Sequence, residues 1–164
     1  MTVSIKTVTV EFLRKGPPHN QLLSPLTEYL GICGESGAGS VTIPYEQATF
    51  NRQLSELRYA DADEDDQVPR QLALRSLGRD LGEMLGHVPG LTGFITEGRG
   101  SDSLLNLQFV TSASELSMLP FELAKVPSST GKSSDDYLAL STATRICITR
   151  RIRSVEPSQV HWPT

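Results

Sequence analysis

The sequence lacks an apolar run that could cross a membrane, which takes about 20 consecutive residues. Its first ten residues, MTVSIKTVTV, resemble a strand and lack the pattern of a signal peptide. The 164 residues suffice for one domain with a core of its own, and 38% hydrophobic and 21% charged residues are typical of soluble globular proteins. We therefore expect a cytoplasmic protein with no membrane partner.

Cysteine and histidine are also scarce. Cys33 and Cys147 lie in apolar runs, which predicts two reduced, buried thiols rather than a disulfide. A cysteine nucleophile needs a histidine close to it in space as its base. His19 lies in a proline-rich loop and His87 ends a predicted helix, so neither suits Cys33. A serine triad is not indicated either, because no Gly-x-Ser-x-Gly sequence is present.

The chain has no excess of positive charge. Its net charge is −4, whereas proteins that bind the phosphate backbone present a basic face. The cluster formed by Arg150, Arg151 and Arg153 is too small to change this expectation. We therefore expect no nucleic-acid partner.

A glycine-rich stretch at residues 34–40 comes close to a phosphate-binding loop. Gly34 and Gly39 have the required spacing, but Ser40 stands where a lysine is needed and Val41 where a hydroxyl is needed. Without these groups the phosphates lose their main counter-charge and Mg²⁺ loses a ligand. The stretch is better interpreted as a hairpin loop, with a degenerate nucleotide-binding module as a minor alternative.

An acidic run at residues 61–66 is the other candidate for a ligand site. It lacks the ligand spacing and the turn glycine of a calcium-binding EF-hand loop. A solvated linker, whose last aspartates favour the start of the next helix, explains it better. We therefore expect no metal and no cofactor.

Strand and helix patterns are mixed along the chain. Alternating or continuous apolar residues predict strands at 3–13, 26–33, 41–43, 104–110 and 145–152. In the first strand the apolar phase changes between Ile5 and Val8, so either a bulge lies near Lys6 or the strand begins at Thr7. Apolar residues at helical spacing predict helices at about 44–59 and 69–88.

This mixture predicts an α/β layered fold. The short turn before Val41 indicates an early antiparallel hairpin or meander. Residues 1–152 form a single domain in this interpretation. Residues 153–164 contain two prolines and no periodic pattern, which indicates a tail or the start of a linker.

Three glycines form a stripe on the second predicted helix. Gly78, Gly82 and Gly86 follow one another at steps of four, so they share one side of the helix. Each costs about 1 kcal/mol relative to alanine in a helix interior. Their recurrence predicts that another stretch of backbone packs closely against that side.

The last predicted strand carries an arginine within an apolar row. Alternation places Arg150 on the same face as Ile146, Ile148 and Ile152. A charge in such a row needs a partner or access to water. The nearest upstream candidate is Glu122, so we predict an ion pair of Glu122 and Arg150, largely removed from solvent.

The segment that holds this pair resembles a known family. CHAT domains, which are caspase-like cysteine peptidases related to caspases and separase, combine three short motifs. Their counterparts here are Leu119-Pro120-Phe121-Glu122, where the family usually has Trp at the aromatic position, then Leu138-Ala139-Leu140-Ser141, then Ile148-Thr149-Arg150. The helical sequence at 77–85 is also similar, and the resemblance covers roughly residues 67–152.

The resemblance implies a caspase-like sheet with helices on its faces, and it favours a helix over a strand at residues 91–97. It covers only the N-terminal, non-catalytic part of such a domain. The family's catalytic histidine and cysteine lie further downstream, beyond Thr164, so no catalytic residue is expected here. The implied partners are the downstream catalytic half of the same protein or a protein activator, in bacterial defence or regulated cell death. We also expect the isolated chain to self-associate or to need its downstream half. The main alternative is a stand-alone adaptor that binds a protein partner.

Overall fold

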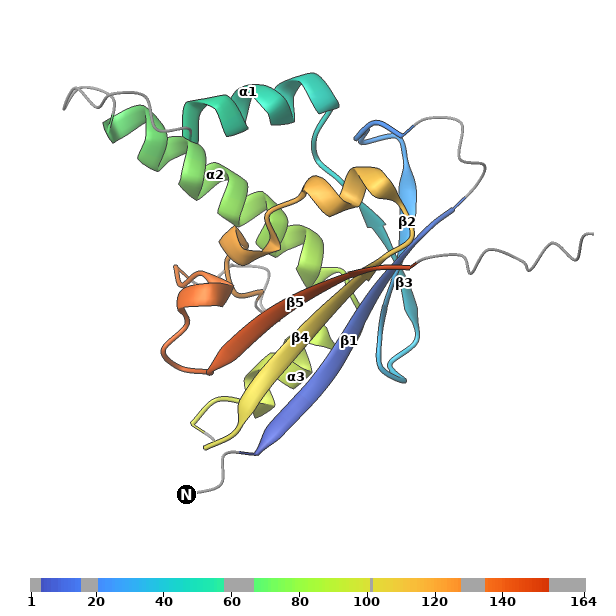
Figure 1. Ribbon diagram of the computed structural model, residues 1–164, viewed down its shortest axis with the longest axis vertical. Helices are drawn as coiled ribbons and strands as arrows, with labels where there is room; N and C mark the ends of the chain where they lie inside the picture. Colours follow the sequence, from blue (N-terminus) through green and yellow to red (C-terminus); the bar gives the residue numbers. More distant parts are fainter. Residues whose placement is uncertain (1–3, 16–20, 58–66, 101, 128–134, 154–164) are drawn as a thin grey trace, which may run out of the picture.

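The computed structural model describes residues 4–15, 21–57, 67–100, 102–127 and 135–153 (Figure 1). The strands are β1 (Ile5–Arg14), β2 (Glu28–Cys33), β3 (Ala38–Thr42), β4 (Leu104–Thr111) and β5 (Ile146–Ile152). The helices are α1 (Gln47–Leu57), α2 (Gln67–Gly86) and α3 (Leu91–Glu97), with single turns η2 (Ser114–Met118), η3 (Phe121–Leu123) and η4 (Leu138–Leu140).

The five strands form one mixed sheet in the order β3-β2-β1-β4-β5. β2 pairs antiparallel with β1 and with β3, whereas β4 runs parallel to β1 and β5 runs parallel to β4. The sequence prediction of an α/β fold with an early antiparallel hairpin is thereby confirmed. Figure 1 shows β5 at the outer edge of the sheet, beside β4.

Among the described residues, one face of the sheet contributes to the core. Alternate side chains of β1, β2 and β4 are buried there: Val8, Val10, Phe12, Tyr29, Cys33, Leu105, Leu107 and Phe109. They join buried residues of α1, α2 and α3 in one cluster. The opposite face carries partly or fully exposed residues: Thr7, Thr9, Glu11, Leu30, Ile32, Asn106, Gln108 and Val110. The helices that the structure describes therefore cover a single face, not both faces as the family resemblance implied.

The phase change in the first strand has a simpler cause than either predicted alternative. β1 begins at Ile5 and pairs with β4 in unbroken register, from Ile5 opposite Leu104 to Phe12 opposite Thr111. Ile5 lies on the open face of the sheet and is 64% exposed. The prediction of a bulge or of a start at Thr7 was wrong, because the apolar character of Ile5 does not reflect burial.

The other element boundaries differ modestly from the sequence predictions. β2 begins two residues late, and Leu26 before it is 92% exposed. β3 begins within the glycine-rich stretch, at Ala38. α1 begins three residues after Pro44, and α3 confirms a helix at 91–97. The acidic run at 61–66 and residues 154–164 of the predicted tail lie outside the described residues.

The glycine stripe of α2 marks a close backbone contact, as predicted. A side-chain carbon at Gly78 would lie 2.7 Å from the carbonyl oxygen of Leu123, and one at Gly82 would lie 2.6 Å from that of Lys125. The backbone N–H of Lys125 also donates a hydrogen bond of 2.8 Å to the carbonyl of Gly78. The segment that follows η3 is therefore fixed against α2 through backbone groups.

Within the described part of the chain, no helix is long and apolar enough to span a membrane.

Candidate functional site at the β5 edge

The turn between β4 and β5 is anchored by an aromatic stack. Phe121 is 1% exposed, and its ring stacks on Phe109 of β4 at 4.4 Å between centroids and on Phe12 of β1 at 5.7 Å. Pro120 precedes it and restricts the backbone of the turn. This anchor places the next residue, Glu122, beside β5.

Glu122 and Arg150 form the predicted ion pair. The Nε of Arg150 donates to Oε1 of Glu122 at 2.8 Å, and its Nη2 donates to Oε2, so the contact is bidentate. A third donor, Nη1, bonds the carbonyl oxygen of Ser117 at 3.1 Å, and the guanidinium lies 5.6 Å from the Phe121 ring centroid. The arginine thus links β5 to η2 and to the turn.

The prediction that this pair is largely removed from solvent was wrong. The side chains of Arg150 and Glu122 are 36% and 42% exposed. β5 is the outermost strand, and the described residues place no further layer over its outer side. Water therefore screens the charges, and the pair is worth about 1 kcal/mol or less rather than the several kcal/mol of a buried pair.

β5 pairs with β4 on one side only, among the residues that the structure describes. The carbonyl of Arg145 and the N–H of Arg153 face β4, because they bond Leu105 and Thr111. In a parallel ladder the backbone groups of alternate residues point to opposite sides. The N–H and C=O groups of the even-numbered residues 146–152 therefore point outward from the sheet.

The side chains of these same residues are incompletely covered on the core face. Ile146 and Ile148 pack partly against the core, and Ile152 is 66% exposed. Nearby, Met118 of η2 is 45% exposed and Leu140 of η4 is 75% exposed. The edge of the sheet therefore combines available backbone hydrogen-bonding groups with apolar side chains, a combination that pairs readily with another strand.

Among the residues that the structure describes, neither cysteine lies in a catalytic arrangement. Cys33 is fully buried at the end of β2, and burial raises the pKa of its thiol to about 11. Such a thiol is protonated at neutral pH and is a poor nucleophile. His87 is exposed at the end of α2, and His19 lies outside the described residues. Cys147 is exposed, contrary to its predicted burial, because it sits opposite Asn106 on the open face of the sheet.

These environments predict that the two thiols react very differently. We expect a thiol-specific reagent at pH 8 to label Cys147 rapidly in the native chain and Cys33 only after denaturation, since burial protects Cys33. Mass spectrometry of labelled peptides measures this, with Cys147→Ser as the control that should show almost no native labelling. Rapid native labelling of Cys33 would contradict its buried position.

The glycine-rich stretch forms a hairpin loop, as predicted. Gly34 and Gly37 have positive φ angles of 55° and 89° and lie in the turn between the antiparallel strands β2 and β3. A phosphate-binding loop leads from a strand into a helix, where backbone N–H groups face the phosphates. This loop leads into β3 instead, so its geometry does not favour the nucleotide-binding alternative.

Sequence reasoning missed a buried charged cluster at the ends of β1 and β2. Glu115 in η2 is 1% exposed, and its Oε1 accepts hydrogen bonds from Tyr29 at 2.9 Å and lies 3.1 Å from Nη1 of Arg14. Its other oxygen, Oε2, is buried without a partner among the described groups. Burial, followed by the hydrogen bond to Glu115, raises the pKa of Tyr29. No local sequence pattern predicts the cluster, because its members come from separate parts of the chain.

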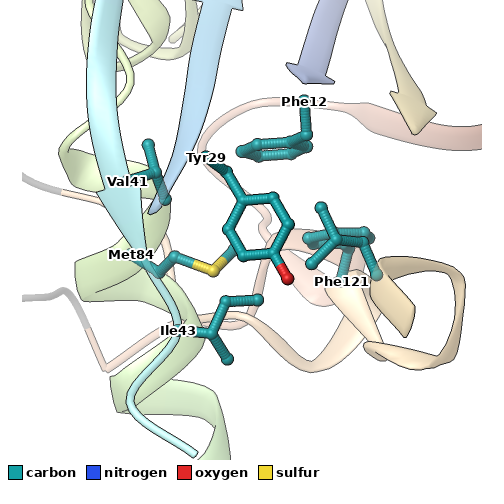
Figure 2. Close-up of a pocket in the computed structure, with 7 residues that line it drawn as sticks. Phe12, Tyr29, Val41, Ile43, Met84 and Phe121 are labelled. Carbon is teal, nitrogen blue, oxygen red and sulfur yellow. The ribbon is translucent and has the colours of Figure 1, made fainter. Parts of the chain in front are cut away.

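A space next to this cluster does not form a binding pocket. It is lined by apolar residues, and Figure 2 shows Phe12, Ile43, Met84 and Phe121 arranged around the Tyr29 ring. The space has no room for a water molecule. It is a gap in the core packing rather than a ligand site. Within the described residues, no three histidine, cysteine or acidic side chains come together in a group that could hold a metal ion.

Comparison of the chain with protein-family models, with curated proteins and with solved structures found no match.

Proposed function

We propose that this chain is a non-catalytic, caspase-like segment, the N-terminal part of a bacterial CHAT-type cysteine peptidase. Its role is to complete the peptidase fold and to support or regulate a catalytic half downstream of Thr164. On its own it cleaves no peptide. A setting in bacterial defence or regulated cell death follows from the same resemblance.

The observation that carries this proposal is the incomplete β5 edge. The motifs of the resemblance surround that strand: Phe121 anchors the turn, Glu122 holds Arg150, and η4 contains Leu138. The parallel strands β1, β4 and β5 follow one another across the sheet, so an additional strand beside β5 would continue the same series. The uncovered second face of the sheet is also consistent with a larger layered domain.

An adaptor that binds another protein is the second candidate. The same edge supports it, because an unpaired strand accepts a strand from another chain as readily as one from its own. The gene distinguishes the two candidates. A histidine and a cysteine at strand ends encoded beyond Thr164 would support the peptidase, and a stop codon directly after Thr164 would favour the adaptor.

The exposed edge itself can be tested with the isolated chain. We expect the average mass from sedimentation to rise with protein concentration, and to rise further in 0.5 M salt, which screens the arginines of β5. Ile152→Asp should abolish this association, since it places a charge at the apolar edge. Val68→Asp is the matched control, because Val68 on α2 is exposed to nearly the same extent, 65% against 66%. A strict monomer at both salt concentrations would contradict an available edge.

A further inference from the structure

The outer side of β5 presents two different surfaces to an added strand. On the core face lie the apolar side chains Ile146, Ile148 and Ile152, with the paired Arg150 between them. On the open face lie Cys147, Thr149, Arg151 and Arg153, because alternate residues point to opposite sides. An added strand would therefore meet apolar groups on one side and polar, basic groups on the other.

All the charged residues of this segment are basic. Residues 145–153 contain four arginines and no acidic residue. Arg150 is paired with Glu122 and Arg153 with Glu11, while Arg145 lies 4.0 Å from Asp102. Arg151 has no ion pair among the described residues. It also lines a shallow groove of about 400 Å³ on the open face, together with Thr9, Glu11, Gln108, Val110 and Arg153.

A second copy of this chain should occupy the edge only weakly at low salt, less well than a segment of opposite charge. Two β5 strands paired antiparallel about Thr149 would place Arg145 opposite Arg153 at both ends of the ladder. Like charges directly opposite each other destabilise a strand pair. The unbalanced positive charge instead favours carboxylates on the open face.

We propose that the β5 edge binds an extended segment in which apolar and acidic side chains alternate. Its apolar residues pack beside Ile146, Ile148 and Ile152, and its carboxylates lie on the open face beside Thr149 and Arg151. Its backbone bonds the outward N–H and C=O groups of β5. This inference rests on the proposed function, since it uses the same edge, and it adds the chemistry of the strand that the edge accepts.

Three nine-residue peptides test the proposal, with valine alternating with glutamate, glutamine or lysine. Each carries a fluorescent label and is used at trace concentration, and binding to the full chain is followed by fluorescence anisotropy. We expect the glutamate peptide to bind best, the glutamine peptide more weakly and the lysine peptide not at all. Affinity for the glutamate peptide should fall as salt rises, because rim charges are screened.

Two variants separate the contribution of Arg151 from the overall charge of the chain. Arg151→Gln should lower the affinity for the glutamate peptide about fivefold, which is the contribution of one partly exposed charge pair. The affinity for the glutamine peptide should not change. Arg52→Gln is the control. Arg52 is exposed on α1, so this substitution removes the same charge at a site away from the sheet. A glutamate peptide with an N-methyl group on every backbone nitrogen should not bind, since neither of its edges can then donate hydrogen bonds to the ladder.

Each outcome decides a different part of the proposal. Equal binding of the glutamate and glutamine peptides would overturn the acidic preference and leave the edge as a docking site. Binding that survives N-methylation would overturn strand addition. If none of the peptides binds, the inference is wrong, and the association of the wild-type chain, compared with Ile152→Asp, then decides separately whether the edge is available at all.

Discussion

Replacing Gly82 with alanine is expected to destabilise the fold by about 3 kcal/mol, at the upper end of the usual cost of overpacking. The new methyl group would lie 2.6 Å from the carbonyl oxygen of Lys125 and 3.2 Å from its carbonyl carbon. Both are backbone atoms, which cannot move aside as a flexible side chain can. Gly78→Ala should behave in the same way, because its methyl group would meet the carbonyl of Leu123 and the ring of Tyr137, each at 2.7 Å.

The chain supplies matched controls for these two substitutions. An added methyl group at Gly93 of α3 has nothing within 4 Å, and one at Gly86 would be 3.8 Å from Pro127, an ordinary contact. Gly93→Ala should therefore gain up to about 1 kcal/mol from helix propensity alone. Urea melts of the four variants give the comparison. If Gly82→Ala were as stable as Gly93→Ala, the backbone contact on α2 would not exist in solution.

The glycine contact matters for the candidate site because it positions the turn. The hydrogen bond from the N–H of Lys125 to the carbonyl of Gly78 holds the segment after η3 against α2. The other side of this segment is bonded to the residues at η4. There the N–H of Val126 donates to the carbonyl of Asp136, and the N–H of Leu138 donates to the carbonyl of Ala124. Glu122 lies just before this segment and forms an ion pair with Arg150 of β5. A shift of the backbone over α2 would therefore move the carboxylate that holds the edge strand.

Sequence reasoning succeeded where the signal is local. Steps of four identify one side of a helix, so the three glycines of α2 predicted the close contact that Gly78 and Gly82 make. Alternation along β5 placed Arg150 on the core face and led to its pairing with Glu122. The same alternation could not predict how exposed the pair is, because it identifies the face of a strand and not the layer that covers that face.

The sequence predictions of burial failed where burial depends on the position of a residue in the sheet. Cys147 lies between two isoleucines, which favoured burial, yet it belongs to the open face of an edge strand and is exposed. Ile5 lies on the same open face. Glu115 was missed because its burial depends on Arg14 and Tyr29, which reach it from strands about 100 and 86 residues away in sequence.

Removing the Glu115 carboxylate should be the most damaging change in the charged clusters. Glu115→Ala leaves Arg14, whose side chain is only 13% exposed, without its counter-charge, and it leaves the Tyr29 hydroxyl without an acceptor. Breaking a buried pair in this way costs about 3–5 kcal/mol. The control is Glu122→Ala, which removes a half-exposed carboxylate from Arg150 and should cost about 1 kcal/mol. Equal losses in urea melts would contradict the difference in burial.

Tyr29→Phe tests the same cluster through its pH dependence. At pH 8 the variant should be less stable than wild type by about 1–2 kcal/mol, since the buried Glu115 loses a hydrogen bond. Burial and Glu115 raise the pKa of Tyr29 in the folded state, so the stability that its protonated form contributes is complete below the unfolded pKa of about 10 and falls as pH rises above it. At one pH unit above that value, the unfolding free energy of the wild type has fallen by about 1.4 kcal/mol. The variant has no hydroxyl at this position and does not lose this amount. The difference in unfolding free energy should therefore shrink towards zero near pH 11, and a gap that stays constant from pH 8 to 11 would show that Tyr29 is not buried against Glu115.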